Sequence, residues 1–143
     1  MTVVLDFEKD IEDAFISVLN VSSDIAPTVR RWRDQSSDEV YPSVLVHCSP
    51  VTNHEATPVG ALNVAIVELG VRTYIPDDKD RATIHNLIGA VRDVIQGSGL
   101  VTALNLASSF TFLDRGIDIG EATDITDERE HQISITLTCQ ITI

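Results

Sequence analysis

The residues that could bind a metal or transfer protons are few in this chain of 143 residues, which has four histidines and two cysteines. His47, Cys48 and His54 come closest to a cluster, but they lack the paired spacing of zinc ligands, such as Cys-x-x-Cys. In a strand, His47 and Cys48 would point to opposite faces, so they could not bind one ion together. Cys139 stands among isoleucines and is interpreted as a small buried hydrophobe. The sequence therefore predicts no metal and no cofactor.

Motifs for nucleophilic catalysis and phosphate binding do not occur in the sequence. Ser43 and Ser49 lie near His47, but proximity along the chain does not indicate a catalytic triad. Gly97-Ser98-Gly99 follows a helical pattern, so it presents no helix N-terminus to a phosphate. Neither a Gly-x-Ser-x-Gly elbow nor a His-Glu-x-x-His pair is present. We therefore predict that the protein is not an enzyme.

Acidic residues outnumber basic ones by 22 to 10, which gives a net charge of −12 at pH 7. Such a surface repels phosphate, and this excludes a protein that coats nucleic acid. The acids concentrate in residues 6–13, 34–39 and 114–130. We interpret the first group as a solvated helix face. The last group is interpreted as a solvated loop, because it lacks the Asp-x-Asp-x-Asp-Gly spacing of a calcium loop.

Arg30, Arg31, Trp32 and Arg33 form the one basic cluster of the sequence and include its single tryptophan. Arginine and tryptophan are enriched where proteins bind one another, so we predict that these four residues form an exposed contact patch. In the alternative interpretation, Trp32 packs on the core and the arginines pair with nearby acids. A basic patch set apart from the acidic segments would allow copies of the chain to join head to tail.

Apolar residues three and four positions apart predict two helices. The first begins at residue 6 or 7 and spans about residues 7–19. The second can be capped by Asp78 or Asp80, and it ends at Gly97-Ser98-Gly99, where glycine favours the left-handed conformation of a helix end. Residues 100–107 form either a short third helix or a buried connector, because periodicity does not decide between them at this length.

Four runs of alternating or β-branched residues predict strands. They span residues 41–48, 61–74, 110–119 and 131–143. The first two are expected to pair as a hairpin around a loop at 49–60, and residues 21–39 are expected to form a polar connection. At this length the chain forms one domain, residues 1–143. The predicted fold class is α+β, with a mostly antiparallel or mixed sheet of about four to five strands flanked by two to three helices.

The last predicted strand has the strongest alternation in the chain. A strand of this length is a hazard at a sheet edge, so it is either central or covered by a neighbouring subunit. Its polar face carries no charge, and we predict Thr136, Thr138 and Gln140 as a second set of contact residues. The apolar face comprises Ile133, Ile135, Leu137, Cys139, Ile141 and Ile143.

The order of these elements resembles that of the tail-terminator proteins, also called tail-completion or neck proteins, of long-tailed bacteriophages. The likeness extends over most of the chain as an arrangement of elements, without a short diagnostic motif. It rests on Tyr41-Pro42-Ser43-Val44-Leu45-Val46, on Asp80 to Ile95 followed by Gly97-Ser98-Gly99, and on the alternating strand from Ile133 to Ile143.

The resemblance implies a non-enzymatic structural protein that forms a ring, typically a hexamer. Such a ring caps the tail tube and docks to the head connector. The implied partners are further copies of the chain, the tail tube and head-connector proteins, without specific nucleic-acid binding and without a membrane. The implied location is the tail or neck of the virion, after assembly in the host cytoplasm. An acidic lumen would suit such a ring, because it repels the DNA that passes through.

Three other hypotheses of function remain open at the level of sequence. The chain could be another phage connector or a baseplate-associated component, or a bacterial adaptor domain. It could instead be a small cytosolic enzyme or ligand-binding domain, with a site near His47, His54 and the acidic segment 121–130. A concave pocket at those residues is what the last hypothesis requires.

Overall fold

The computed structural model describes residues 7–23, 25, 29–31, 41–49, 52–57, 60–108 and 111–142, and the statements below concern these residues. A single turn of 3-10 helix, Ile75–Asp77, follows the longest strand. The helices and strands are, in chain order, α1 (Phe7–Asn20), β1 (Val29–Arg31), β2 (Ser43–Cys48), β3 (Thr52–Thr57), β4 (Gly60–Tyr74), α2 (Ala82–Ile95), α3 (Leu100–Ala107), β5 (Thr111–Asp124) and β6 (Glu130–Thr142).

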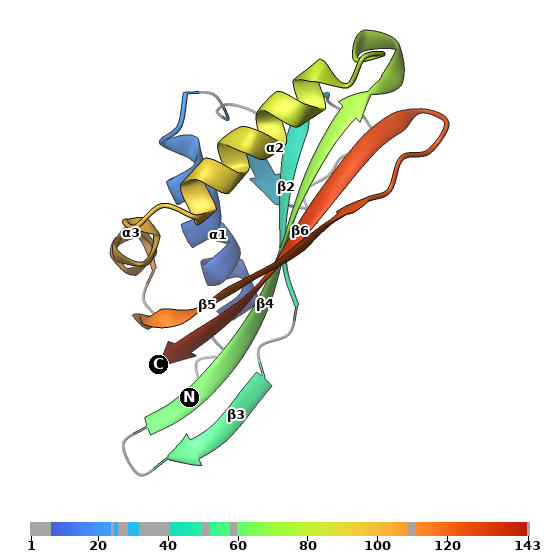
Figure 1. The fold of residues 1–143 in the computed structure, drawn as a ribbon. Coiled ribbons are helices and arrows are strands. Elements are labelled where there is room, and N and C mark those ends of the chain that lie inside the picture. The colour runs from blue at the N-terminus through green and yellow to red at the C-terminus, as the bar shows by residue number, and fades with distance from the viewer. Residues whose placement is uncertain are drawn as a thin grey trace.

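One six-stranded sheet organises the chain, and the three helices lie on one side of it (Figure 1). The strand order is β1-β2-β4-β6-β5, and β3 pairs with β4 outside this path. β1 runs parallel to β2, whereas the other pairs are antiparallel, so the sheet is mixed. The α+β class with a mixed sheet and three flanking helices confirms the predicted fold. β2 and β4 pair as the sequence predicts.

Two strands lie in segments that the sequence predicts as connections. β1 falls within the expected polar connection at 21–39, and β3 falls within the expected loop at 49–60. Neither has an apolar alternation of its own from which it could be predicted. Each forms through backbone hydrogen bonds to a longer neighbouring strand. β5 also continues to Asp124, so the first acids after residue 119 belong to a strand and not to a turn.

The C-terminal strand β6 occupies the inside of the sheet, between β4 and β5. β4 pairs with it continuously from Leu62 to Tyr74. Of the two alternatives that the sequence allows, the structure therefore shows the central position. The predicted apolar face packs against the helices, and its described members are all buried: Ile133, Ile135, Leu137, Cys139 and Ile141.

The helices cover the sheet with the apolar stripes that the sequence predicts. Phe15 of α1 is fully buried and meets Phe112 of β5 edge to face, with ring centres 6.1 Å apart. α3 is a true helix, and it buries Leu100 and Leu104. In the described chain no single helix is long and apolar enough to cross a membrane; α2 and α3 reach that length and composition only as a pair bent by 83°. The stripe of α2 comprises Ile84, Leu87, Ile88, Val91 and Ile95.

Candidate functional site

β1 divides the predicted basic cluster between the two faces of the sheet. Arg31 lies on the helix side, where its Nη2 is 2.9 Å from Oδ1 of Asp13 in α1. Arg30 is the preceding residue of the strand, so it lies on the opposite face. Trp32 and Arg33 lie outside the described residues. For Arg31 the structure thus shows the pairing with a nearby acid that the alternative interpretation expects.

The acids of α1 do not all face solvent, and Glu12 corrects the interpretation of this helix face. Its side chain is fully buried and accepts a hydrogen bond of 2.9 Å from the amide of Cys48, the last residue of β2. Nδ1 of His47 lies 3.7 Å from the same carboxylate oxygen. Glu12 follows Ile11 and precedes Phe15 by three positions, so the apolar stripe carries it inward. Through this hydrogen bond, Glu12 connects α1 to the end of β2.

The second set of predicted contact residues lies on the face of the sheet opposite the helices, here called the open face. Register pairs Ile66 of β4 with Thr138 of β6, and Val64 with Gln140. Thr136 and Thr138 are exposed, Val64 and Gln140 are half-buried, and Ile66 keeps 43% of its surface exposed. We call these five residues the open-face patch. All five are uncharged, but two exposed acids lie directly beside them on the same face, because Glu68 pairs with Thr136 and Asp118 pairs with Thr138.

The far end of the open face is occupied by its own aromatic and charged side chains. The ring of Tyr41 stacks on that of Tyr74, with centres 5.6 Å apart, and the guanidinium of Arg72 lies 5.4 Å from the centre of the Tyr41 ring. Nε of Arg72 donates to Glu130 at 2.9 Å, and the hydroxyl of Tyr41 donates to the same carboxylate at 2.6 Å. The charge of Arg72 is therefore buried and paired within the subunit.

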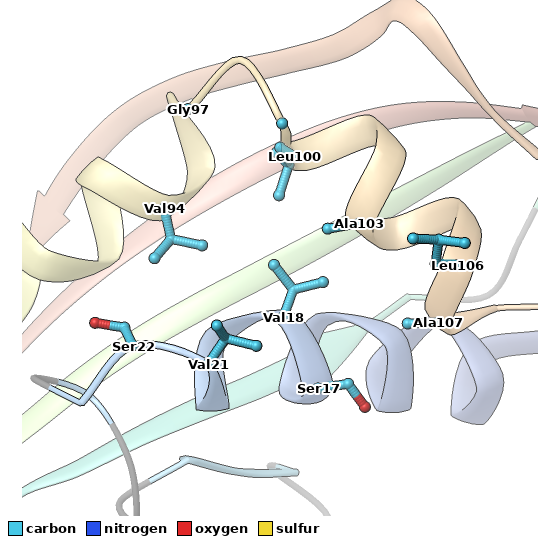
Figure 2. A pocket seen from close by; sticks show the side chains of 11 residues that line it. Ser17, Val18, Val21, Ser22, Val94, Gly97, Leu100, Ala103, Leu106 and Ala107 are labelled. Atoms are coloured by element: carbon cyan, nitrogen blue, oxygen red, sulfur yellow. The ribbon is translucent and has the colours of Figure 1, made fainter.

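An apolar groove lies on the helix layer, between the end of α1 and α3 (Figure 2). Its volume is about 540 Å³, and none of the eleven described residues that line it is charged. Val21 and Leu106 line it and are each 85% exposed, more than any other large apolar side chain described. The side chains of Val18, Val94 and Leu100 also point into it (Figure 2). The groove is therefore a place where exposed apolar side chains gather on the helix layer.

Sequence reasoning missed this groove, although α3 carries a signal for it. Leu100 and Leu104 are one turn apart and both buried. Leu106 is rotated by about 200° from Leu104 around the helix axis, which follows from 3.6 residues per turn. An apolar residue on the outer side of a short helix is the feature that points to the groove. Val21, just after α1 ends, is the matching feature on the other rim.

Asp78 holds the start of α2, as the sequence predicts for one of two aspartates. The residue that directly precedes the helix, Arg81, has φ 63° and makes no side-chain cap. The carboxylate of Asp78 instead accepts hydrogen bonds from the amides of Thr83, at 2.8 Å, and Ile84, at 3.0 Å. The hydroxyl of Thr73 donates to it at 2.8 Å. These bonds satisfy amides that a helix start otherwise leaves without partners.

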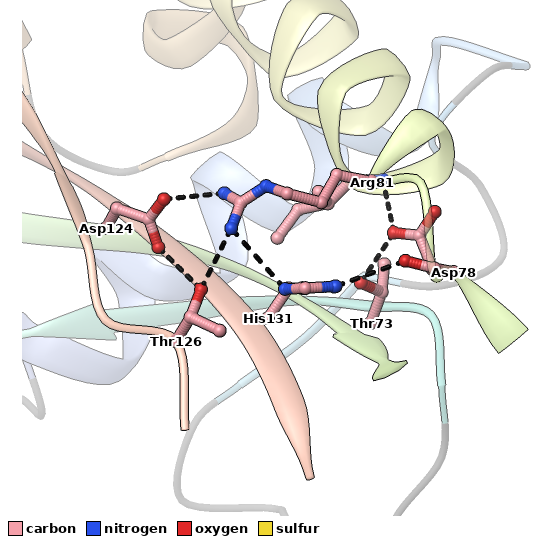
Figure 3. A network of polar contacts seen from close by, with 7 residues as sticks. Thr73, Asp78, Arg81, Asp124, Thr126 and His131 are labelled. Carbon is pink, nitrogen blue, oxygen red and sulfur yellow. Dashed lines mark hydrogen bonds and ion pairs between the residues drawn. The ribbon is translucent and has the colours of Figure 1, made fainter. Parts of the chain in front are cut away.

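Arg81 connects the start of α2 to the β5–β6 hairpin (Figure 3). Its guanidinium pairs with Asp124 at 2.5 Å and donates to the hydroxyl of Thr126 at 3.1 Å. Nε2 of His131 donates to the carbonyl of Asp78 at 3.1 Å, which leaves Nδ1 to accept from Arg81 at 3.4 Å. The groups in this network are matched donor to acceptor, so they support one another and are not aimed at a ligand.

The carboxylates of the network are ionised at neutral pH. Burial alone would raise the pKa of Asp78, but the hydrogen bonds from Thr83, Thr73 and Ile84 outweigh burial and place the pKa below its ordinary value. The hydroxyl of Thr126 lowers the pKa of Asp124, and Arg81 lowers it further. Their charge therefore stabilises the fold and is not poised for proton transfer near pH 7.

Two smaller hollows lie near the residues of the enzyme hypothesis. One, of about 260 Å³, includes His47 and Glu68 on the open face, and the other, of about 460 Å³, includes Arg92 and Glu121. Neither set of lining residues contains a serine, threonine or cysteine beside a base. The side chain of His54 lies outside the described part. Within that part, His, Cys, Asp and Glu form no group of three that could hold a metal ion.

The two cysteines, Cys48 and Cys139, are both buried and are not joined by a disulfide. Burial raises the pKa of Cys139 to about 12, so its thiol stays protonated at neutral pH and is a poor nucleophile. Sγ of Cys48 donates to the carbonyl of Ser49 at 3.3 Å. The surroundings of Cys139 are those of the small buried hydrophobe that the sequence predicts.

The fold is similar to folds seen in solved structures. A chain from the virion of a native gene transfer agent particle aligns with 94% of this chain and 96% of its own length, with a TM-score of 0.67 and 18% identity. A second solved structure aligns with 94% of this chain and 92% of its own length, with a TM-score of 0.54 and 15% identity. No known family model matches the sequence, and no curated protein is significantly similar to it. At these identities the similarity shows a shared α+β fold.

Proposed function

We propose that this protein is a non-enzymatic structural subunit of a virion of the bacteriophage type. The observation that carries the proposal is its fold, which is shared almost end to end with a chain of a gene transfer agent virion. We further propose the role of tail terminator. In that role, copies of the chain form a ring, typically a hexamer, that caps the tail tube and docks to the head connector.

Exposed uncharged surface supports a role in assembly. The described residues place an apolar groove on the helix layer and exposed Ile66, Thr136 and Thr138 on the open face, whereas their most elaborate polar network is satisfied within the subunit. We propose Arg30, Arg31, Trp32 and Arg33, with Thr136, Thr138 and Gln140, as residues near the contacts with neighbouring subunits. The net charge of −12 suits a ring around a DNA conduit, because the wall repels the passing phosphates.

Electron microscopy of the purified protein tests the ring, and native mass spectrometry gives its stoichiometry. We expect closed rings that bind the ends of tail tubes from the particle to which the chain belongs. Binding to a purified head connector, but not to tube ends, would instead favour a connector role. A monomer at high concentration that binds neither tubes nor connectors would contradict the proposal.

Arg30→Glu tests the basic contact patch without disturbing the core. Arg31 is a poorer choice, because its pairing with Asp13 supports the subunit itself. We expect Arg30→Glu to weaken ring formation or docking while the melting temperature stays within a few degrees. Lys79→Glu is the matched control, since Lys79 is exposed in the turn before α2 and undergoes the same change of charge. Equal assembly of the two variants would remove Arg30 from the contact.

A further inference from the structure

The main path of the sheet ends in two edge strands, β1 at one end and β5 at the other. Among the strands that the structure describes, β1 pairs only with β2, and β5 pairs only with β6. An edge strand keeps a row of backbone amides and carbonyls with which a further strand can pair. A strand of another chain that adds to such an edge continues the sheet from one molecule into the next.

The two edge strands carry matching stretches of three residues. Residues 117–119 of β5 pair in register with β6 and lie between two register shifts. This regular stretch has the same length as β1, Val29–Arg31. The middle residue of each stretch is charged, and strand alternation turns it to the face opposite its two neighbours. The charges have opposite signs, because Arg30 is the middle residue of β1 and Asp118 is that of the β5 stretch.

The faces of the two edges also correspond. Asp118 pairs with Thr138 on the open face, whereas Ile117 packs against the core on the helix side. In β1, Val29 belongs to the same core, so Arg30 lies on the open face. Residues on the same face of neighbouring strands stand side by side. A sheet continued from β5 into the β1 of another copy can therefore place Arg30 beside Asp118, with Val29 beside an apolar residue of β5 on the helix side.

The side chains of Arg30 and Asp118 are available to a neighbouring copy. Asp118 is exposed and Arg30 is half-buried, and neither forms an ion pair or a side-chain hydrogen bond with another described residue. The other charges on these edges differ in this respect. Arg31 of β1 and Asp124 of β5 each pair with a residue of opposite charge in their own subunit.

Charge favours a contact between unlike edges. Each copy carries −12, so copies repel one another in general. Two β5 edges would bring acid against acid, and two β1 edges would bring arginine against arginine, and like charges opposite one another destabilise strand pairing. Only the pairing of β1 with β5 places opposite charges in contact. It thereby offsets the general repulsion at the point where the copies meet.

Strand direction agrees with the same contact. β1 is parallel to β2, and the direction then reverses at β4, at β6 and at β5. Within one copy, β1 and β5 therefore run in opposite directions. Copies that follow one another in the same orientation bring β1 antiparallel to β5, and antiparallel pairing is slightly more stable per residue than parallel pairing.

We propose that β1 of one copy adds to the β5 edge of the next copy, with Arg30 beside Asp118 on the open face. The contact joins two different edges of the same chain, so it is heterologous and repeats from copy to copy until the rotation closes a ring. This inference rests on the proposed ring and names the edges that build it. The partner at each edge is a second copy of this chain.

Two charge reversals test the contact, one on each edge. Arg30→Glu and Asp118→Arg each place like charges side by side, and we expect each to weaken self-association by at least about tenfold in sedimentation velocity. Asp118→Arg also makes the chain less negative, so general repulsion alone would predict stronger association. Asp93→Arg is the matched control, because Asp93 is exposed on α2, outside both edges. Circular dichroism and melting of each variant report whether the subunit stays folded.

Restoring opposite charges separates a direct contact from a general effect. The double variant with Arg30→Glu and Asp118→Arg exchanges the two charges, so it should assemble as the unaltered protein does. A 1:1 mixture of the two single variants should also assemble, because every contact between unlike copies then joins an acid to an arginine. Native mass spectrometry should find equal numbers of the two variants in each ring. Failure of both combinations to restore association would overturn the inference.

Hydrogen exchange tests the strand pairing apart from the charges. Amides of residues 117–119 that point away from β6 would donate to β1 of the neighbouring copy in the assembly. We expect them to exchange at least about tenfold more slowly in the ring than in dilute monomer. The amides in the middle of α2, which the helix already bonds, serve as the reference. Unchanged exchange in this stretch of β5 would show that no strand adds there.

The behaviour of the unaltered protein distinguishes this inference from the proposed function. Rings that persist unchanged in Arg30→Glu or in Asp118→Arg would overturn the edge contact while leaving the ring role in place. An unaltered protein that stays monomeric at high concentration would overturn the contact. Its binding to tail tubes would then decide whether the virion role fails with it.

Discussion

The two ends of helix α2 lie in opposite kinds of surroundings. At its start, Asp78, Arg81, Asp124 and His131 form a network in which donors meet acceptors within one subunit. At its end, Val94 lines an apolar groove whose rims are the most exposed large apolar side chains described. Both ends are at the surface of the same small domain, so the contrast does not arise from a difference in how deeply they are buried.

The contrast separates what stabilises the subunit from what is available to a partner. A satisfied polar network makes a fold rigid and leaves little for a ligand to gain. An uncovered apolar groove contributes little to the stability of the monomer, because its surface is not removed from water until something packs on it. The first region therefore predicts large effects on unfolding, and the second predicts small effects on unfolding with large effects on association.

Among changes to the polar network, Asp78→Ala is expected to have the largest effect on stability. It removes the acceptor of three hydrogen bonds and leaves the amides of Thr83 and Ile84 and the hydroxyl of Thr73 without it. We expect the free energy of unfolding to fall by about 2–4 kcal/mol, from loss of the cap and of buried partners. Urea unfolding followed by circular dichroism measures this change.

Asp80→Ala is the matched control for the cap. Asp80 is exposed and accepts one bond, 3.2 Å from the amide of Ala82. Its removal should lower the free energy of unfolding by less than about 1 kcal/mol, since solvent replaces the lost bond. If the two alanine variants unfolded at the same urea concentration, Asp78 would not be the group that holds α2.

Acid should reduce the contribution of Asp78 to the free energy of unfolding. The pKa of Asp78 lies below its ordinary value of 3.8, so its ionised form stabilises the fold above that pH, and the contribution is lost as the pH falls toward the pKa of the folded state. In Asp78→Asn this contribution is absent at every pH. We therefore expect the urea midpoints of the two proteins to converge below about pH 4. Parallel curves between pH 3 and 7 would show that another group governs the acid response.

Arg81 allows backbone strain to be measured apart from its side-chain contacts. Its φ of 63° lies in the left-handed region, which is unfavourable by about 1–2 kcal/mol for residues other than glycine. Arg81→Ala and Arg81→Gly both remove the contacts to Asp124 and His131, but only glycine relieves the strain. We expect the glycine variant to be more stable by about 1 kcal/mol. An alanine variant of equal stability would place the strain elsewhere.

Periodicity in the sequence predicts the elements that bury their own apolar stripes. α1, α2, β4 and β6 follow from spacing alone, and the alternation of β6 also predicts which of its residues face away from the core. The strands β1 and β3 do not, because their pairing depends on the edge that β2 or β4 offers to them. Pairing by a neighbour is information that a local pattern does not contain.

The candidate surfaces were predictable to the same extent. Thr136 and Thr138 are exposed on the open face, as alternation predicts. The basic cluster could not be resolved, because Arg30 and Arg31 are separated only once β1 is known to be a strand. From the sequence, Glu12 is expected to be a solvated acid like its neighbours. Its burial depends on the amide of Cys48, which is 36 positions away. Long-range contacts of this kind come from the tertiary fold.

Leu106→Ala is expected to have the smallest effect on stability, and it defines the groove most sharply. Leu106 is 85% exposed, so its removal should change the free energy of unfolding by less than about 0.5 kcal/mol. Leu104, two residues earlier on α3, is fully buried, and Leu104→Ala should lower the free energy of unfolding by about 2–5 kcal/mol. Urea unfolding of dilute monomer measures both.

The comparison of Leu104→Ala with Leu106→Ala is informative because both replace a leucine of the same helix, and only the side of the helix differs. A loss above about 1 kcal/mol in Leu106→Ala would mean that the leucine packs within its own subunit, so that the groove is part of the core. A negligible loss in the free energy of unfolding, together with weaker association at higher concentration, would mean that Leu106 makes its contacts only when the protein associates. In that case the groove at the end of α2 is removed from water only when a neighbouring copy packs on it.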